Sequence, residues 1–209
     1  MVDEHKNTQA GQASSEAEQT ASSVGDVTAG VVSIRRGGAG NVKAEWVDIL
    51  QGGARNVTGT KVTLRQAGAQ TVTAEQLVIR QGATLWAKAD NLEMTQGGAG
   101  LLQVDTAKLI ASPVGVVIAK GDVTMDQAVG RLVLAAGNVK MDQAGAAVVA
   151  ARDVKAENCN TLLLLAGRVE GDVKAVFGPR ESAIFGVVTG AVAGGVLLLA
   201  RLVQQRRRR

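Results

Sequence analysis

Large and reactive side chains are scarce in this chain of 209 residues. It has two Phe, two Trp, no Tyr and two Pro, although 46% of its residues are hydrophobic. Aromatic side chains usually fill wide cores and ligand pockets, so their scarcity predicts a thin core of Ala, Val, Leu and Ile. The single Cys159 excludes an intrachain disulfide and a zinc site built on several cysteines. The single His5 argues against a histidine-dependent enzyme.

The positive charge of the chain is concentrated near its C-terminus. The formal net charge is +4, and residues 179–209 alone contain six Arg and one Glu. Residues 183–200, among them, contain no charged residue and are mostly apolar. Basic residues beside an apolar run indicate a membrane-associated segment before they indicate a nucleic-acid binder. We therefore expect a membrane partner and no nucleic acid.

Residues 1–26 are rich in Gln, Ser, Thr, Ala and Glu and show no apolar periodicity. Such a segment buries too little apolar surface to offset the entropy lost on ordering, so we predict a disordered polar tail. It also lacks the basic stretch followed by an apolar stretch that marks a secretory signal.

From residue 27 to residue 178 the sequence repeats with a period of about fifteen residues. Each unit opens with two apolar residues two positions apart and then reaches a glycine-containing corner, as in Val47, Ile49, Gly52 and Gly53. Alternating Val, Ile and Leu, interrupted by Gly at a fixed offset, predicts short strands and tight corners. The units open at Val32, Val47, Val62, Leu77, Leu92, Leu109, Val123, Val139, Val154 and Val169.

Two arrangements fit this repeat: antiparallel hairpins, or a parallel β-solenoid in which each unit forms one rung. Stacking like residues at about 4.8 Å rewards the likeness between units, which a hairpin array does not need. We therefore predict an all-β fold, a parallel β-solenoid of nine to ten fifteen-residue rungs. Pro113 takes the fifth position of the unit opened by Leu109, and spacings of 17 and 14 residues flank that unit. We expect a bulge or bend in this unit.

A column of glutamines occupies the fifth position of the unit. Continuing the alternation from positions one and three turns this position inward, where an amide needs hydrogen bonds from the units above and below. We therefore predict an inward amide ladder, with the following glycines supplying the positive φ of the corner. A surface Gln at a tolerant corner is the alternative. The predicted ladder consists of Gln51, Gln66, Gln81, Gln96, Gln127 and Gln143.

Residues 183–203 predict one transmembrane α-helix, joined to the solenoid by residues 179–182 and followed by a polybasic tail at 204–209. The 18 uncharged residues 183–200 would span about 27 Å as a helix, close to the thickness of the hydrocarbon core. Small residues recur at every fourth position, which lets two helices pack closely, although Gly is also common in membrane helices generally. The helix-packing residues are Ser182, Gly186, Gly190 and Gly194, and the residues expected at lipid headgroups are Arg201, Arg206, Arg207, Arg208 and Arg209.

Two rules disagree about the orientation of this helix. The positive-inside rule places the Arg-rich end in the cytoplasm and the solenoid outside, whereas the lack of an export signal favours a cytoplasmic solenoid. We expect a tail anchor with the solenoid in the cytoplasm. The ending GVLLLAR followed by arginines resembles the C-terminal anchors of small bacterial tail-anchored proteins, which implies the bacterial inner membrane.

In architecture, the chain resembles the bactofilins. The shared features are a polar N-terminal tail, a β-solenoid over residues 27–178, attachment to a membrane, and glycine-rich stretches that recur with the repeat instead of forming one nucleotide-binding loop. Bactofilins are bacterial cytoskeletal proteins that polymerise end to end through their solenoids. The resemblance implies a homo-oligomer or polymer at a membrane.

We therefore predict a non-enzymatic, membrane-anchored scaffold that self-assembles through its anchor, its solenoid ends or both, without a cofactor, metal or small-molecule substrate. A solenoid displayed outside the cell as a binding or adhesion rod is the alternative. An enzyme built on a left-handed β-helix, like the hexapeptide acyltransferases, would need rungs of about eighteen residues and a catalytic His within the repeat. His5 lies outside the repeat.

Overall fold

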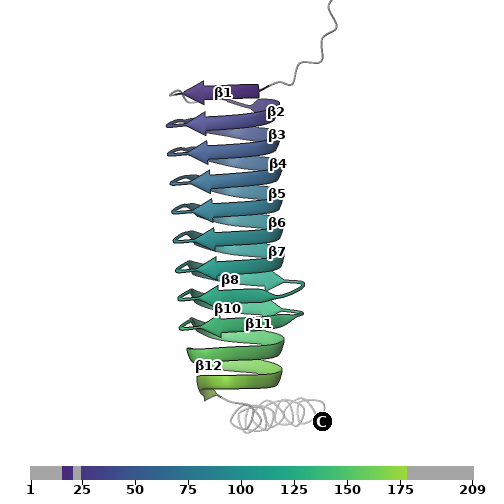
Figure 1. The fold of residues 1–209 in the computed structure, drawn as a ribbon, viewed down its shortest axis with the longest axis vertical. Coiled ribbons are helices and arrows are strands. Elements are labelled where there is room, and N and C mark those ends of the chain that lie inside the picture. The colour runs from purple at the N-terminus through teal and green to yellow at the C-terminus, as the bar shows by residue number, and fades with distance from the viewer. Residues whose placement is uncertain (1–15, 21–24, 178–209) are drawn as a thin grey trace, which may run out of the picture. The chain divides into compact units, whose positions relative to one another are not determined.

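The computed structural model of the chain describes residues 16–20 and 25–177, with side chains described from residue 25 to residue 171. The described residues are all-β and form a parallel β-solenoid of about nine turns, as the repeat predicts (Figure 1). The chain divides after Ala99 into two compact units, called here unit 1 and unit 2.

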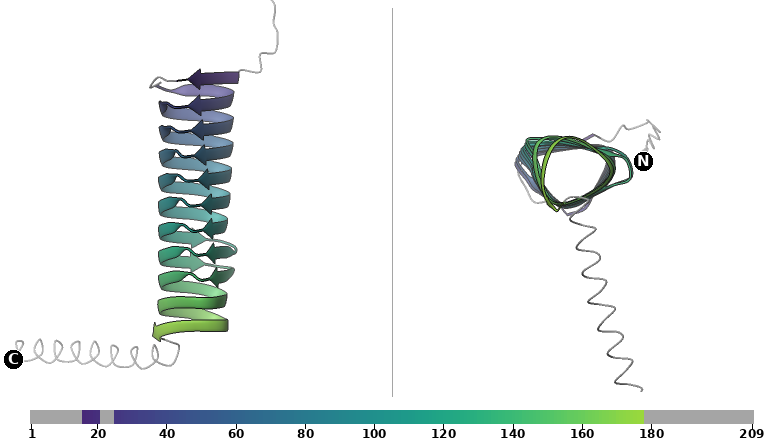
Figure 2. Two further views of the ribbon diagram at one scale, coloured as in Figure 1. Left: turned by 60° about the vertical axis from the view of Figure 1, so that its left-hand side comes forward. Right: turned by 90° about the horizontal axis from the view of Figure 1, so that it is seen from below.

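In unit 1 each strand pairs in parallel with the next along the chain, in the order β1 to β6. The register joins residues fifteen positions apart, such as Val47 with Val62. Most of these strands are 13 residues long and bend around the turn without interruption (Figure 2). The strands are β1 Glu16–Thr20, β2 Val27–Arg35, β3 Gly38–Leu50, β4 Gly53–Arg65, β5 Gly68–Arg80 and β6 Ala83–Thr95.

In unit 2 the first turns are divided into shorter strands that pair along two sides of the coil, whereas β12 runs for 33 residues without interruption. On one side β8 pairs with β10 and β10 with β12, and on the other β9 pairs with β11 and β11 with β12. β7 crosses the boundary between the units, and its last residues pair with β9. The strands are β7 Gly98–Ile110, β8 Pro113–Ala119, β9 Val123–Asp126, β10 Val129–Ala135, β11 Asn138–Asp142 and β12 Gly145–Phe177.

The core of each unit consists of inward-facing aliphatic side chains stacked in columns. One column of unit 1 runs through Val32, Val47, Val62 and Leu77, none more than 2% exposed. Because alternate residues of a strand face opposite sides, the second apolar residue of each repeat points inward as well. Burial of a side chain of this size contributes about 1.5–3 kcal/mol, so the columns supply most of the stabilisation of a described core that contains no aromatic side chain.

The predicted register at Leu109 is wrong by two residues. β7 pairs with β9 so that Ala107 lies beside Val123 and Leu109 beside Met125. Ala107, 5% exposed, therefore opens its turn, and Val123 follows sixteen residues later instead of fourteen. Ala107 was not predicted to open the turn because Ala is a weaker sequence signal of an inward position than Val, Leu or Ile.

The expected irregularity occurs in this turn, but not at Pro113. Pro113 begins β8 and pairs in register with Val129, so a strand start accommodates its missing N–H donor. The corner of this turn falls at Ala111, which has a φ of 47°. This turn is one residue longer than the usual fifteen. The extra residue is accommodated within residues 120–122, between β8 and β9, where the strand is interrupted.

Part of the predicted disordered tail is a strand. Residues Glu16–Thr20 form β1, which pairs in parallel with Val31–Arg35 of β2. Main-chain hydrogen bonds do not require apolar side chains, so a polar segment can add to an open strand edge that its composition does not predict. The remaining predicted segments at 179–182, 183–203 and 204–209 lie outside the described residues. Within the described residues, no helix is long and apolar enough to cross a membrane.

Some of the glycines at the corners lie close to the main chain of the turn before, although other turns hold Ala at the same position. A Cβ added to Gly82 would overlap the main-chain carbonyl oxygen of Ala67 in the turn before. Gly68 is different, because the nearest atom to an added Cβ is the Ala83 carbonyl oxygen at 3.6 Å. We expect Gly82→Ala to lower the free energy of unfolding by about 1–3 kcal/mol, measured by equilibrium urea unfolding followed by circular dichroism.

The matched control for this experiment is Gly68→Ala, since the residue in register with Gly68 in the next turn is Ala83. We expect this control to change the free energy of unfolding by less than about 0.5 kcal/mol. Equal losses in the two variants would contradict the close approach at Gly82.

Candidate functional site

The candidate site of this fold is its outer surface, where each turn repeats a position of the turn before. The corners define the repeat, because nine non-glycine residues in the described part of the chain have φ between 46° and 54°. This left-handed conformation turns the chain sharply, and Asn and Gln tolerate it better than β-branched residues do. The corner residues are Arg36, Gln51, Gln66, Gln81, Gln96, Ala111, Gln127, Gln143 and Asn158.

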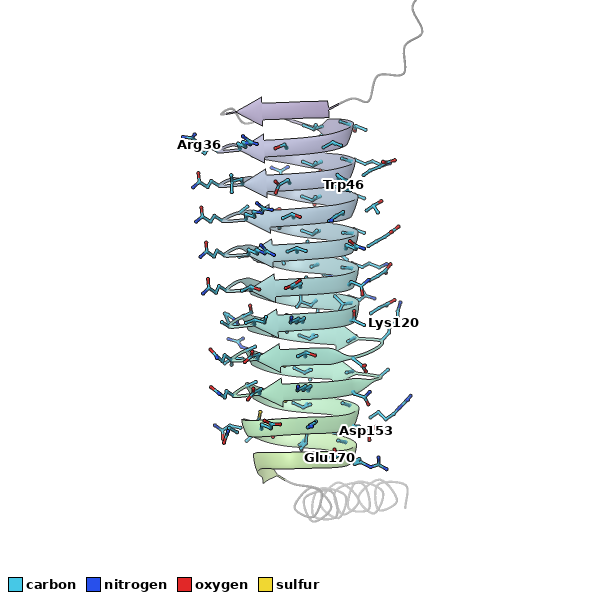
Figure 3. The ribbon with its side chains drawn as sticks, in the orientation of Figure 1. Arg36, Trp46, Lys120, Asp153 and Glu170 are labelled. Atoms are coloured by element: carbon cyan, nitrogen blue, oxygen red, sulfur yellow. The ribbon has the colours of Figure 1, made fainter. Side chains whose placement is uncertain are left out.

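The glutamines of unit 1 form an amide ladder on the outside of the corner. Gln51 Nε2 donates to Gln66 Oε1 at 3.0 Å, Gln66 Nε2 donates to Gln81 Oε1 at 3.2 Å, and Gln81 Nε2 donates to Gln96 Oε1 at 3.2 Å. All four side chains are exposed, and Arg36 at the first corner also points away from the coil (Figure 3). The ladder was predicted for these residues, but its predicted inward direction is wrong.

The left-handed corner explains the direction of the ladder. A residue with φ near +50° interrupts the strict alternation of a strand, so the fifth position turns outward and the next residue turns inward. Ala67, Ala128 and Ala144 occupy that inward position and are at most 5% exposed. The glycines were expected to supply the positive φ, and this is also wrong, since Gly171 is the one glycine with positive φ in the described part of the chain.

The remaining corner glutamines, Gln127 and Gln143, stand at equivalent positions of unit 2 and are exposed. Cys159, beside the last corner, is 1% exposed, and its Sγ donates to the Glu157 carbonyl oxygen at 3.2 Å. Ser112 makes the same type of contact with the Ile110 carbonyl oxygen at 2.7 Å. The cysteine is therefore a packed core residue, as its small size suggests.

A second polar column in unit 1 escaped the sequence interpretation. Asn56 Nδ2 donates to Asn41 Oδ1 at 2.6 Å, and Asn41 Nδ2 donates to Asp26 Oδ1 at 2.7 Å. The signal was the dipeptide Asn-Val, repeated fifteen residues apart at Asn41 and Asn56. Like the glutamine ladder, this column ties successive turns together through exposed side chains.

Charges also follow the register, in a different way in each unit. In unit 1 the residue before the corner is Arg35, Leu50, Arg65 and Arg80 in successive turns. In unit 2 the same position holds Asp126, Asp142 and Glu157. The described residues contain no group of three His, Cys, Asp or Glu suited to a metal ion. We interpret both columns as solvated strips of one sign.

The most unusual surface is an aliphatic face on unit 2. Val116, Leu132 and Val148 lie side by side in register on β8, β10 and β12, and so do Ile118, Leu134 and Ala150. Leu163 and Leu165 follow Val148 and Ala150 by one repeat of fifteen residues. All point outward, since none is buried while the residues between them are, such as Val117, Val133, Val149 and Leu164. The aliphatic face consists of Val116, Ile118, Leu132, Leu134, Val148, Ala150, Leu163 and Leu165.

The sequence carried a signal for this face that was missed. The strands of unit 1 alternate between apolar and polar residues, as in NVTGT, whereas the corresponding stretches of unit 2 are continuously apolar: VVIA, LVLA, VVAA and LLLLA. Continuous apolar strands are typical of sheets covered on both faces. The common fifteen-residue period drew attention to the inward positions, which are similar in both units.

The last described turn leaves its core partly open. Val169 continues the inward column of Val139 and Val154, which are 1% and 2% exposed, yet Val169 itself is 39% exposed. At the other end, β1 pairs with Val31–Arg35 of β2, and Val27 is half-buried although its neighbour Val42 is 2% exposed. The core columns thus reach the surface at each end of the described solenoid.

The other predicted site residues lie outside the described residues. These are the helix-packing residues Ser182, Gly186, Gly190 and Gly194 and the headgroup residues Arg201, Arg206, Arg207, Arg208 and Arg209. No protein-family model, curated protein or solved structure gives a significant match to the chain.

Substitutions of Gln66 compare the free-energy cost of the left-handed corner with the stabilisation from the amide hydrogen bonds. Gln66→Gly removes two exposed amide hydrogen bonds but relaxes the left-handed corner, so we expect the free energy of unfolding to change by less than about 1 kcal/mol. Gln66→Val places a β-branched residue at φ of 50°, and we expect a loss of about 2 kcal/mol or more. Urea unfolding of both variants checks this, and a larger loss for Gly than for Val would mean that the ladder outweighs the backbone strain.

Proposed function

We propose that this chain is a non-enzymatic scaffold that is anchored in a membrane and assembles by stacking the ends of its solenoid. The observation that carries the proposal is the 39% exposure of Val169 at the end of a core column whose earlier members are buried. An open solenoid end presents both unpaired main-chain groups and apolar side chains. A second copy that stacks its first turn on this end satisfies both.

The first and last turns of the solenoid are suited to each other because the same inward residue types recur in each turn. Val139 pairs with Val154, and Val154 lies one repeat before Val169, so another turn with Val at this position would continue the column. The first turn of unit 1 offers Val32 and Ile34 at the corresponding inward positions. β1 covers part of this turn, so we propose that β1 gives way to the end of the incoming copy, since main-chain pairing does not depend on its polar side chains.

The membrane part of the proposal rests on residues 183–203. Their length, their lack of charge up to residue 200 and the arginines that follow are typical of a transmembrane helix with a headgroup-binding end. We place the protein in the bacterial cytoplasmic membrane, with its solenoid on the cytoplasmic side. The Gly186, Gly190 and Gly194 row would add a second contact between copies within the bilayer.

Filament formation by the detergent-solubilised full chain tests the stacking of the ends. We expect negative-stain electron microscopy to show filaments one solenoid wide at high protein concentration. Val169→Asp would place a charge in the stacked core, so we expect it to weaken association at least about tenfold, or about 1.4 kcal/mol. Single short rods of the unsubstituted chain at every concentration would contradict end stacking.

The matched control is Glu170→Lys, which changes the charge of the neighbouring residue on the exposed side of the same turn (Figure 3). We expect its filaments to resemble those of the unsubstituted chain. Circular dichroism of both variants verifies that the solenoid remains folded, so that a loss of filaments in Val169→Asp is assigned to the end itself.

The anchor is tested by a charge at the centre of the apolar run. Val192→Arg costs about 2.5–3.5 kcal/mol for insertion into a bilayer, so we expect a large fraction of this variant in the soluble fraction of cells. The control Val192→Leu keeps the segment apolar and should remain in the membrane fraction after alkaline extraction. Equal partitioning of the two variants would contradict a transmembrane anchor.

A further inference from the structure

We propose that the aliphatic face of unit 2 rests against the surface of a lipid bilayer with its basic rim among anionic headgroups. The proposal deepens the proposed function, because it depends on residues 183–203 holding the chain at a membrane. In this proposal the aliphatic face of the solenoid contacts the membrane in addition to residues 183–203.

The first step is that this face is poorly suited to water. Ile118 and Leu165 are 42% and 49% exposed, and the side chains between them in the two columns are aliphatic throughout. The positions five and seven residues after the corner hold Asn56 and Thr58 in unit 1, and Thr71 and Thr73 one turn later. These positions are polar in those two turns and hold Trp86 and Lys88 in the next one, so the fold does not require aliphatic residues there.

The second step concerns size. Four turns spaced at about 4.8 Å, each contributing a stretch of about three residues at 3.3 Å, give a patch of roughly 200 Å². A stable interface between two proteins buries about 800 Å² on each partner, so this face is too small to hold a second copy by itself. A bilayer needs no such area, because an anchored chain is already held close to the surface and a small apolar contact then suffices.

The third step concerns charge at the rim. Lys120 follows β8, Arg131 lies within β10 beside Leu132, and Arg152 follows Ala150 by two residues in β12, and all three are exposed. Lys120 Nζ also lies 2.9 Å from Asp105 Oδ1. Anionic headgroups attract an exposed basic residue by about 1 kcal/mol, which favours a lipid surface beside Arg131 and Arg152.

The fourth step concerns position. The aliphatic face belongs to the last turns of the described chain and ends at Leu165, eighteen residues before residue 183. The acidic residues Asp126 and Asp142 lie on β9 and β11, on the other side of the coil from β8 and β10. The part of the solenoid nearest in sequence to the apolar segment is thus the part with an apolar wall and a basic rim.

A fluorophore attached to the face tests this proposal in the full chain. The background is Cys159→Ala, because Ala128 and Ala144 fill the equivalent buried position in neighbouring turns. A single cysteine is introduced as Ile118→Cys or, as the matched control, Thr73→Cys, both seven residues after their corners and exposed. The labelled proteins are reconstituted in vesicles of three parts phosphatidylcholine and one part phosphatidylglycerol, with and without nitroxide-labelled lipid.

We expect nitroxide lipid to quench the label at residue 118 several-fold more strongly than the label at residue 73, with a blue-shifted emission at residue 118. Flotation of the vesicles measures the anchor separately. Flotation with a label at residue 118 that remains open to aqueous iodide would overturn the lipid contact and leave the anchor standing. Flotation with a label shielded from iodide but not quenched by nitroxide lipid would show that protein covers the face, which also overturns the proposal. Absence of flotation would overturn the anchor and the lipid contact together.

Discussion

Parallel main-chain pairing between successive turns is the constraint on which the rest of this structure depends. Because each residue pairs with the residue one repeat away, as Val47 does with Val62, its environment is copied from turn to turn. A position is therefore inward or outward for a whole column at once. The constraint also brings main chains close together at the corners, where only small residues such as Ala67, Gly82 and Ala128 follow the corner glutamines. Repetition of sequence follows from repetition of environment.

The parts of the fold that could be predicted are those in which large aliphatic residues mark the inward positions. Val, Leu and Ile at the opening positions of the repeat revealed the solenoid and its core columns. Ala107 did not, because a single methyl group is a weak signal of an inward position. The register predicted from the sequence was therefore wrong by two residues at this turn. The direction of the glutamine ladder could not be obtained from alternation, because a left-handed corner at Gln66 breaks the alternation that the prediction assumed.

The aliphatic face shows a different limit of sequence interpretation. Inward columns are similar in both units, so a search for the period finds the same residues in each. Outward columns are free to differ, and they change from Asn and Thr around Thr71 to Val, Leu and Ile around Leu132. The information about function lies in this second set, since the pairing between turns does not dictate it. Comparing outward positions turn by turn, instead of averaging over the repeat, would have found the face from the sequence.

A solenoid of this kind presents the same chemical group about every 4.8 Å along its surface. Such rows are poorly matched to a small ligand, which needs several different groups converging on one point. They are well matched to extended partners: another solenoid end, which continues the rows of main-chain groups and of Val side chains, or a bilayer, which meets a flat apolar wall. The open column at Val169 and the wall around Leu134 are two places where apolar side chains of the described chain reach the surface. The open column and the aliphatic face are different surfaces, so a partner bound at one leaves the other accessible.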